Sequence, residues 1–500
     1  MFAQTWQKSL ALAALTGFGL GLRLLNLTNP PLDFHAWRQL RSATIARAMY
    51  YEMAPGAADE GTRVKAVELA RNFDVLEPRL LERLVAFTYA SLGKELLWIA
   101  RLWSIGFWVV GGLGIYALAS RMTSPPAGLV SLGIFLLLPY GVIASRSFQP
   151  DPAMVAFMVL GILAVVLWME RLEWRWAILA GLLSGMAILV KVFAVFPIGF
   201  ASVATLLSRR NGWKAVLTPQ AWILLILSAG IPALYYLMEV GDLAGGYIQG
   251  WVLAFTRLIG QPMFYVRWGA QLDNVLGLPL LLAALGGVFL LPAGPRWTVL
   301  GMWAGYGAYG LTVPSLVITH DYYNLPVIPI AALSVAGLTQ TVIAILDNRH
   351  RAWRVVAAAI LALLGMVAFR QSLVRLFAQD FRPEVIGWEK MGRELPRNAK
   401  IIGLTHDYSA RLAYYGWTAV RAWPYSVDMQ MHDMGGGNSN LEDPVWRQTF
   451  LERAADQDYF LVTLFAELDA QPILKSILYE NYPFREGDGY ILFDLRRKNP

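Results

Sequence analysis

The sequence contains no cysteine and comparatively few charged residues. The absence of cysteine excludes structural disulfides, thiolate zinc sites and a cysteine nucleophile. Charged residues fill 15% of the 500 positions and hydrophobic residues fill 56%, whereas about a quarter of a typical soluble chain is charged. This deficit of charge indicates a protein that is partly surrounded by lipid.

The charge that is present is positive overall. The net charge of +7 suits either nucleic acid or anionic lipid head groups. Many of the basic residues stand in short segments between apolar runs, and this placement favours the lipid head groups. We therefore expect contact with membrane lipids and no nucleic-acid partner.

Apolar runs of nearly 20 residues recur through the first three quarters of the chain. A helix of this length crosses the roughly 30 Å hydrocarbon core of a bilayer. The first run has no small-residue cleavage site after it, so we interpret it as a retained span and not as a signal peptide. We predict about eleven transmembrane helices, near residues 8–27, 97–118, 126–143, 153–169, 174–190, 192–207, 220–238, 275–291, 297–314, 323–345 and 354–370.

The orientation follows from Lys and Arg in the short loops. Alternate loops carry Arg121, Arg171, Arg210, Arg296 and Arg351, and the turns between them hold fewer basic residues. We expect a protein of the cell (inner) membrane with a cytoplasmic N-terminus and an extracytoplasmic C-terminus. We interpret 174–207 as two short helices broken at Lys191 and Pro197. A single bent helix there would instead reverse the orientation of every later span.

Three long segments are then predicted outside the membrane. In the first, 28–96, residues 78–92 mix apolar residues with arginine and glutamate at helical spacing, which indicates a helix lying in the membrane surface. The second, 239–274, is rich in aromatic residues. The third is the C-terminal tail.

The tail has an ordinary composition and short β-like runs between helical stretches. These runs are residues 400–404, 459–465 and 490–495. We therefore predict a polytopic α-helical membrane protein with outer-face juxtamembrane helices and a small soluble C-terminal α/β domain. The predicted domains are a transmembrane catalytic domain at 1–370 and an extracytoplasmic domain at 371–500.

Three glycine-rich stretches do not indicate a nucleotide site. GYGAYG at 305–310 matches the dinucleotide fingerprint but lies within an apolar run with no strand before it. Its small residues, like those of GLLSG at 181–185, more simply allow helices to approach closely. The run at 435–437 is most simply a flexible loop.

Acidic side chains gather at the predicted outer face. Asp33, Glu77 and Asp151 stand beside predicted spans or the surface helix. Each has a plain alternative explanation, because carboxylates favour helix N-termini. Asp33 lies in PPLDFHAWRQ, among aromatic and basic residues, and this setting favours a functional role.

Several basic side chains accompany these acids. If a helix begins near His35, then His35, Arg38 and Gln39 share one face; His35 is either a metal ligand, a base or a solvated interfacial histidine. Lys191 interrupts an apolar run, and a basic residue at membrane depth marks an anionic partner unless it reaches to the interface. His320 enters the tenth predicted span with an aromatic rim.

Acids and bases converging on one face suit a reaction between a lipid-borne anion and a molecule from outside. Sugar transfer from a polyprenyl phosphate is such a reaction. The attacking hydroxyl must lose a proton to a carboxylate, and the leaving phosphate needs cationic stabilisation. A single acid on the attacking face predicts inversion, by analogy with inverting glycosidases.

Five motifs in order resemble the C-superfamily of membrane glycosyltransferases, and in particular the bacterial relatives of protein O-mannosyltransferase and lipid A aminoarabinose transferase. The resemblance covers residues 1–345. It is carried by PPLDFHAWRQ, LEPRLLERLVAFTYASLG, SRSFQPDPAM, ILVKVFAVFP and HDYYNLPVIP.

The resemblance implies roles for individual residues. The presumed base of the family maps onto Asp33 and its second acid onto Asp151, which we expect to orient the acceptor or Arg38. The basic residue of the mid-chain motif maps onto Lys191. We expect Lys191 and Arg38 to stabilise the donor phosphate, with weaker assistance from two further arginines, Arg257 and Arg267.

A metal ion is the one cofactor that the resemblance implies. A glutamate that binds a divalent metal in some members maps onto Glu77, but Glu-Pro-Arg stands here in place of Glu-x-Pro-Pro. The resemblance also implies a histidine ligand from a middle outer loop, but segment 239–274 has no histidine, so a metal would need His35 or His320.

These observations predict an enzyme that transfers a sugar from a polyprenyl-phosphate donor to a lipid, glycan or protein acceptor. The alternative is a non-catalytic structural subunit of a membrane complex with this fold. A secondary transporter is disfavoured, because the chain shows no paired halves with broken helices.

Overall fold

The computed structural model describes the chain except residues 1, 74–76, 209–211, 241–247, 435–443 and 499–500. The glycine run at 435–437 lies outside the described residues. The chain divides into two compact units. We call Met1–Leu27, Val75–Leu80 and Ala100–Ala378 the helical unit, and Thr28–Asp74, Leu81–Ile99 and Gln379–Pro500 the sheet-containing unit. The predicted boundary at residue 371 stays a prediction.

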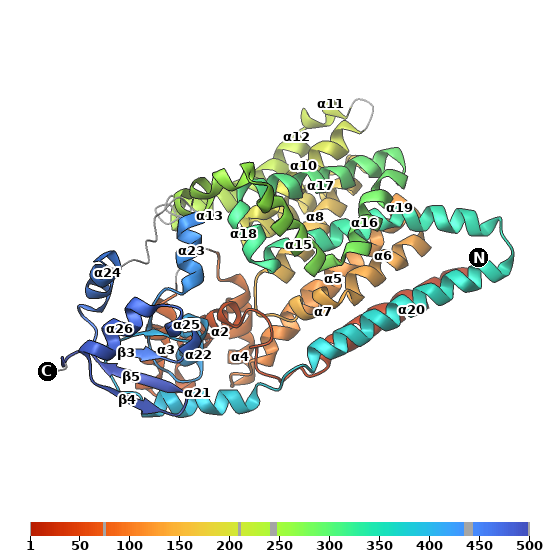
Figure 1. Cartoon of the computed structure of the whole chain (residues 1–500). Coiled ribbons are helices and arrows are strands. Elements are labelled where there is room, and N and C mark those ends of the chain that lie inside the picture. The colour runs from red at the N-terminus through yellow and green to blue at the C-terminus, as the bar shows by residue number, and fades with distance from the viewer. Residues whose placement is uncertain (1, 74–76, 209–211, 241–247, 435–443, 499–500) are drawn as a thin grey trace. The chain divides into compact units, whose positions relative to one another are not determined.

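The helical unit consists of apolar helices joined by short connections (Figure 1). Its described elements are α1 (Phe2–Leu24), α5 (Trp98–Met122), α6 (Pro125–Leu137), α7 (Pro139–Ala144), α8 (Asp151–Arg171), α9 (Trp174–Val190), η2 (Val192–Ala194), α10 (Val195–Leu207), α11 (Trp213–Val216), α12 (Pro219–Leu225), η3 (Ile226–Gly230), α13 (Ile231–Glu239), η4 (Ile248–Val252), η5 (Leu253–Gly260), α15 (Pro262–Leu276), α16 (Leu278–Gly287), η6 (Val288–Leu290), α17 (Ala293–Thr312), α18 (Pro314–Thr319), η7 (Asp321–Asn324), α19 (Val327–Asp347) and α20 (Arg351–Leu376).

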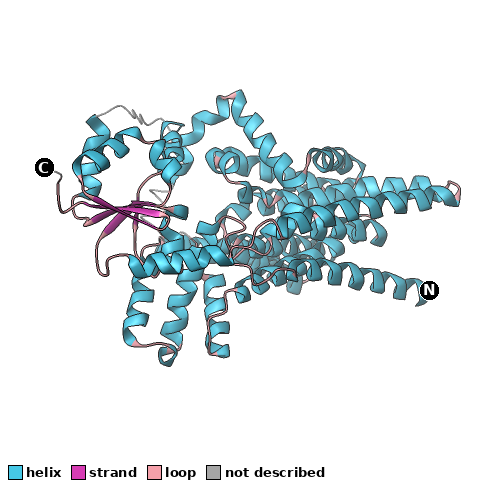
Figure 2. Ribbon diagram, turned by 60° about the horizontal axis from the view of Figure 1, so that its bottom comes forward, coloured by secondary structure: helices cyan, strands magenta, loops and turns pink. Residues whose placement is uncertain are grey.

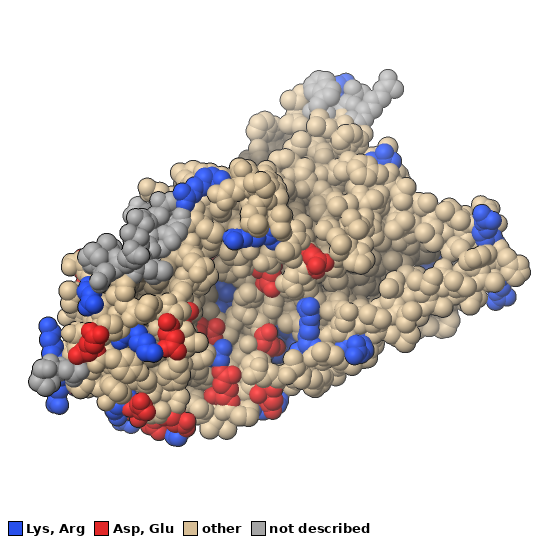
Figure 3. Space-filling model, in the orientation of Figure 1, with Lys and Arg blue, Asp and Glu red and all other residues tan. Residues whose placement is uncertain are grey.

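The length and composition of these helices are those of an integral membrane protein. Among the described residues, five helices are long and apolar enough to cross a bilayer, or six if a bent pair forms one span. Three further apolar helices, α6, α9 and the run Val192–Leu207, are shorter. Figure 3 shows that the helices present a mostly uncharged surface on the face drawn. The fold is therefore polytopic, and the count of eleven spans and their orientation stay predictions.

Two predicted spans differ from straight helices. The run predicted at 126–143 divides at Pro139 into α6 and α7. The run predicted at 275–291 continues α15, but the helix axis bends by 96° between Leu276 and Leu278. Gly277 allows this bend because its φ is +79°, a region that costs glycine little. Part of the segment predicted as an outer loop, 262–274, is therefore helical.

Glycines bring helices of this unit into close contact, as predicted. A Cβ atom on Gly305 of α17 would lie 2.5 Å from the carbonyl oxygen of Phe196 in α10. A Cβ atom on Gly185 of α9 would lie 2.3 Å from a backbone carbonyl of η3. The first and last long helices, α1 and α20, also run side by side (Figure 1), with ring centroids of Phe18 and Phe369 5.4 Å apart.

The sheet-containing unit combines helices of the first predicted outer segment with the C-terminal domain. Its described elements are α2 (Ala36–Met53), η1 (Pro55–Ala57), α3 (Glu60–Arg71), α4 (Leu80–Leu92), α21 (Arg382–Glu394), β1 (Ile401–Leu404), η8 (His406–Ser409), α22 (Ala410–Tyr414), β2 (Arg421–Ala422), α23 (Ser426–Met434), α24 (Pro444–Ala454), β3 (Tyr459–Val462), α25 (Phe465–Asp469), α26 (Pro472–Asn481), β4 (Phe484–Gly487) and β5 (Tyr490–Asp494).

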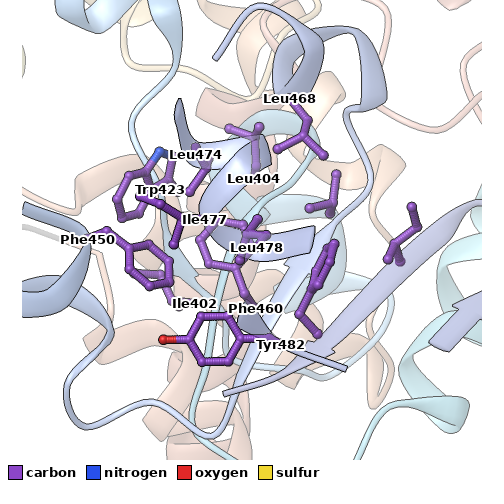
Figure 4. Packing of buried hydrophobic residues seen from close by; sticks show 13 residues of the cluster. Ile402, Leu404, Trp423, Phe450, Phe460, Leu468, Leu474, Ile477, Leu478 and Tyr482 are labelled. Atoms are coloured by element: carbon purple, nitrogen blue, oxygen red, sulfur yellow. The ribbon is translucent and has the colours of Figure 1, made fainter. Parts of the chain in front are cut away.

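The five strands form one mixed sheet in the order β2-β1-β3-β5-β4 (Figure 2). Strands β2, β1 and β3 are parallel, and β5 is antiparallel to both β3 and β4. The three strands predicted from the sequence are present, and the two edge strands, β2 and β4, were missed. Alternate side chains of β1, β3 and β5 enter cores on opposite faces, as expected from the period of two. Figure 4 shows one core, where Trp423, Phe450 and Leu478 pack over the sheet.

Helix α2 is fastened to the C-terminal domain through a buried arginine. Arg47 donates to the Glu95 carboxylate at 3.0 Å and to the carbonyl oxygen of Tyr414 at 2.6 Å. Its guanidinium also lies over the Tyr414 ring, 3.9 Å from the centroid. The Tyr414 hydroxyl donates to Glu95 at 2.6 Å, which closes the cluster. The predicted helix at 78–92 is present as α4.

Candidate functional site

Two sequence-predicted site residues, Asp151 and Lys191, meet within the helical unit. Asp151 is the first residue of α8 and is followed by Pro152, which is compatible with a first helical turn. The chain returns through α9, which ends at Val190. Lys191 then adopts an extended conformation, φ −156° and ψ 111°, before α10 begins. The helix break that was predicted at Lys191 therefore places its side chain beside the start of α8.

Asp151 and Lys191 form a buried ion pair. The distance from Lys191 Nζ to Asp151 Oδ1 is 2.6 Å, and the two side chains are 3% and 1% exposed. The other carboxylate oxygen, Asp151 Oδ2, has no hydrogen-bond partner among the described residues. Burying two charges costs desolvation energy that their attraction often does not recover, so a contribution to stability does not by itself account for this pair. The sequence predicted neither the pairing nor the depth of burial.

Aromatic rings complete the surroundings of the ammonium group. Lys191 Nζ lies 4.0 Å from the ring centroid of Tyr323 and 5.1 Å from that of Tyr322, within the range of a cation–π interaction. Both tyrosines belong to η7, directly after His320, whose ring lies 5.9 Å from the Tyr323 ring. His320 also shares a hydrogen bond with Thr319 at 2.8 Å. The predicted rim of His320 and its tyrosines thus lies beside Lys191.

A side-chain amide secures these tyrosines. Asn324, which is fully buried, donates to the carbonyl oxygen of Val317 at 2.9 Å and accepts from Trp268 at 3.2 Å. The hydroxyl of Tyr306 also donates to Asn324. Asn324 was not predicted as a site residue, and its position directly after the tyrosine pair is the signal that the sequence carries.

The loop that carries Asp33 belongs to the sheet-containing unit. Its fold depends on Gln39, which is fully buried and whose amide donates to the carbonyl oxygens of Phe34 at 2.7 Å and Pro31 at 3.3 Å. The same amide lies 3.4 Å from Asp33 Oδ1. These contacts bend the loop around the Gln39 side chain, with the half-buried Asp33 carboxylate beside it.

Helix α2 follows this loop, so the condition predicted for a shared face of His35, Arg38 and Gln39, a helix that begins near His35, is met. His35 precedes the helix in a left-handed conformation, φ 45° and ψ 63°, which is uncommon for a residue with a Cβ atom. The amide of Arg38 donates to the carbonyl oxygen of His35 at 2.9 Å, so Arg38 lies in the first turn. Asp33, His35 and Arg38 therefore belong to one short segment.

The remaining predicted residues are less enclosed. Arg257 in η5 and Arg267 in α15 have exposed side chains, and Glu77 is half-buried in the segment Val75–Leu80 of the helical unit. Asp151 was expected to orient the acceptor or Arg38, but the contact that the structure gives it is with Lys191. The roles of all these residues stay predictions.

The described residues offer no ready ligand set for a metal ion. No group of three or more His, Asp or Glu side chains in that part of the chain is arranged to hold one. Glu77, His35 and His320 stay the predicted ligands, and no step proposed below passes through a metal. A requirement for a divalent ion stays a prediction.

Comparison with known proteins identifies the fold. Residues 80–236, less than half of the chain, match the family described as dolichyl-phosphate-mannose-protein mannosyltransferase. No curated protein sequence matches the chain.

Solved structures match almost the whole chain. The ArnT structure from Cupriavidus metallidurans in the apo state has a TM-score of 0.58 at 14% identity and covers 99% of this chain and 98% of that one. The same protein bound to undecaprenyl phosphate has a TM-score of 0.57 at 14% identity, with 96% and 97% covered. The archaeal oligosaccharyltransferase AglB from Archaeoglobus fulgidus, in complex with an inhibitory peptide and a dolichol-phosphate, has a TM-score of 0.57 at 12% identity and covers 99% of this chain and 74% of that one.

The family match covers most of the second motif and all of the third and fourth. The family match includes both Asp151 and Lys191, and the fold extends over the sheet-containing unit as well as the helices. The predicted resemblance to the C-superfamily of membrane glycosyltransferases is therefore confirmed, by a family match in part of the sequence and by the fold along nearly all of it.

Proposed function

We propose that this protein is a membrane glycosyltransferase that moves a sugar from a polyprenyl-phosphate donor to an acceptor hydroxyl at the outer face. The observation that carries the proposal is the buried Asp151–Lys191 pair with its tyrosine rings, set in a fold shared with ArnT. Asp151 accepts from one of the three N–H donors of Lys191, and the other two can serve a second anionic partner. The donor phosphate is such a partner.

The chemistry requires one proton acceptor. The acceptor oxygen attacks the anomeric carbon, the bond from that carbon to the phosphate oxygen breaks, and its electron pair leaves with the polyprenyl phosphate. The hydroxyl proton passes to the Asp33 carboxylate, which acts as general base. Attack opposite to the leaving group inverts the anomeric configuration.

The leaving phosphate gains negative charge as the bond breaks. Lys191 has three N–H donors, and Asp151 accepts from only one of them in the structure. Asp151 and Tyr323 hold the ammonium in place, so that it is organised before charge develops on the phosphate. Arg38 is proposed to stabilise the leaving phosphate together with Lys191, and Arg257 and Arg267 to add weaker electrostatic support.

Polyprenyl-phosphate release tests this proposal directly. The purified protein in lipid nanodiscs is offered a panel of polyprenyl-phosphate sugars, and the freed lipid phosphate is measured by mass spectrometry. We expect wild type to hydrolyse one donor slowly in the absence of an acceptor. The divalent ion that the family resemblance implies predicts that a chelator lowers this rate, and an unchanged rate would contradict that requirement.

The rival proposal is a non-catalytic subunit of a membrane complex. It predicts no release from any donor, with or without extracts that supply acceptors, and recovery of the protein in a stoichiometric complex. Lys191→Met separates the two readings further, because only the transferase reading predicts weaker binding of undecaprenyl phosphate. Lys94→Met, at an exposed position, is the matched control.

A further inference from the structure

The C-terminal sheet reverses the direction of its strand connections at the end of β1. Strand β1 lies between β2 and β3 and is parallel to both. The connection from β1 to β2 contains α22, whose Leu412 packs on one face of the sheet, and the connection from β2 to β3 contains α24, whose Phe450 packs on the other. The connection from β1 to β2 runs to one side of β1, and the connection from β2 to β3 crosses back to the other side, so the end of β1 lies at a topological switch point. Ligands of open α/β sheets bind at the carboxyl ends of strands at such points.

The loop at this point, Thr405–Ser409, has an unusual backbone. Asp407, Tyr408 and Ser409 are three successive residues with positive φ, at 50°, 49° and 73°. Such conformations are unfavourable for residues with a Cβ atom and persist where the surroundings enforce them, commonly at functional sites. Here Thr405 Oγ1 and Ser409 Oγ share a hydrogen bond of 2.7 Å, and Thr463 at the end of β3 accepts from the amide of His406 at 3.1 Å.

Tyrosine rings hold and line this loop. The Tyr408 and Tyr425 rings are stacked with centroids 4.1 Å apart and an interplanar angle of 12°. The amide of Tyr408 donates to the Tyr425 hydroxyl at 2.9 Å, and the Tyr408 hydroxyl donates to Asp428 at 2.9 Å. Both rings remain half-buried, so part of each surface is open to a ligand.

The same loop meets the Asp33 segment within the sheet-containing unit. The Trp37 ring lies edge-on to the Tyr408 ring with centroids 6.5 Å apart. His35 and Asp407 interact electrostatically. Asp407 also pairs with Arg411, which pairs in turn with Glu384. The end of β1 and the segment that carries the proposed base therefore form one surface.

We propose that this surface, with Trp37, Asp407 and Tyr408 as its contact residues, binds a saccharide as the acceptor. That the bound saccharide is the acceptor of the reaction rests on the proposed function, whereas the presence of a saccharide-binding site does not. Aromatic rings provide flat apolar surfaces for the C–H faces of sugar rings, and a carboxylate accepts hydrogen bonds from neighbouring sugar hydroxyls through its two oxygens.

The charges of the loop favour an uncharged saccharide over a phosphorylated ligand. Arg411 is shared between the two carboxylates of Asp407 and Glu384, and Asp428 adds a third carboxylate nearby. An anionic ligand would meet this excess of negative charge. A peptide acceptor is the competing class, and it is an outcome of the test.

The test measures binding of a β-1,4-linked N-acetylglucosamine tetramer to the full-length protein in nanodiscs, by saturation-transfer NMR. Asp407→Gly is the decisive variant, because glycine accepts the backbone conformation of this position while the carboxylate is lost. We expect the dissociation constant to rise at least tenfold, with a melting temperature equal to or above that of wild type. Asn398→Gly, at an exposed residue with φ 60° before β1, is the matched control and should bind as wild type does.

The outcomes are distinct. Lack of binding to wild type, or equal binding by wild type and Asp407→Gly, would overturn the inference. Binding of a Ser/Thr-containing peptide in place of the tetramer, lost in Asp407→Gly, would overturn the saccharide and assign a peptide. Polyprenyl-phosphate release is measured separately, so a protein that binds the saccharide but cleaves no donor would refute the proposed function and leave the binding site standing.

Discussion

Breaking the buried ion pair should be expensive, and unequally so for its two members. Lys191→Met leaves the Asp151 carboxylate buried with neither oxygen paired, because Asp151 Oδ2 already lacks a partner among the described residues. Removal of one member of a buried pair costs about 3–5 kcal/mol. In Asp151→Asn, the ammonium keeps the Tyr323 ring at 4.0 Å, a contact worth about 2 kcal/mol when desolvated. We therefore expect a smaller cost of about 1–3 kcal/mol for Asp151→Asn.

A double variant separates the pair from its surroundings. Asp151→Leu combined with Lys191→Met replaces both charges by apolar groups of similar size. The free energy of unfolding of this double variant should lie within about 1 kcal/mol of that of wild type. Thermal unfolding in detergent, followed by circular dichroism, compares these proteins with the exposed control Lys94→Met. A cost below about 1 kcal/mol for Lys191→Met would refute the reasoning, because it would mean that the carboxylate is solvated or protonated without penalty.

Three other predictions concern packing, the Asp33 loop and pH. Gly305→Ala should destabilise the protein by about 1–3 kcal/mol, because its Cβ atom would lie 2.5 Å from a carbonyl oxygen of α10. A Cβ atom on Gly307 of the same helix meets nothing within 4 Å, so Gly307→Ala should be neutral or stabilising in thermal unfolding. Gln39→Ala should lower the free energy of unfolding by about 1–3 kcal/mol, because two buried carbonyls lose their donor. It should also slow polyprenyl-phosphate release more than a variant of equal stability in which the Asp33 loop is unchanged. Burial lowers the pKa of the His406 imidazole below its usual 6.5. The unfolded chain therefore binds the proton more readily, so the free energy of unfolding should fall as the pH drops below about 6.5. His406→Gln should flatten this dependence of stability on pH, and an unchanged dependence would contradict the assignment.

Much of the helical architecture follows from the sequence because hydrophobic runs are strong signals. The break at Lys191 was predictable, since a lysine inside an apolar run disrupts it, and the close approach at Gly305 followed from small residues at helical spacing. The bend at Gly277 was not, because its apolar flanks continue the pattern of a single span. Strand β2 escaped prediction for a similar reason, since two residues are too few to show a period of two.

The site was predictable as a set of residues and not as a set of contacts. Position beside apolar runs singled out Asp151 and Lys191, but their pairing depends on the antiparallel return of α9 along α8. The importance of the loop around Asp407 left no signal in composition. Its left-handed backbone is set by hydrogen bonds to Tyr425 and Thr463, which lie far away in sequence and come together only through the parallel sheet.

The measurement that tests the central claim most directly compares turnover with donor binding in Asp33→Asn. Glu68→Gln, an exposed carboxylate of the same predicted outer segment, makes the same chemical change and serves as the control. With the donor identified by the release assay, we expect Asp33→Asn to lose at least 100-fold in turnover, on the order of a general base's contribution, while its affinity for the donor stays within about threefold of wild type. An Asp33→Asn protein with full turnover would contradict the account, because the hydroxyl proton would then have another acceptor.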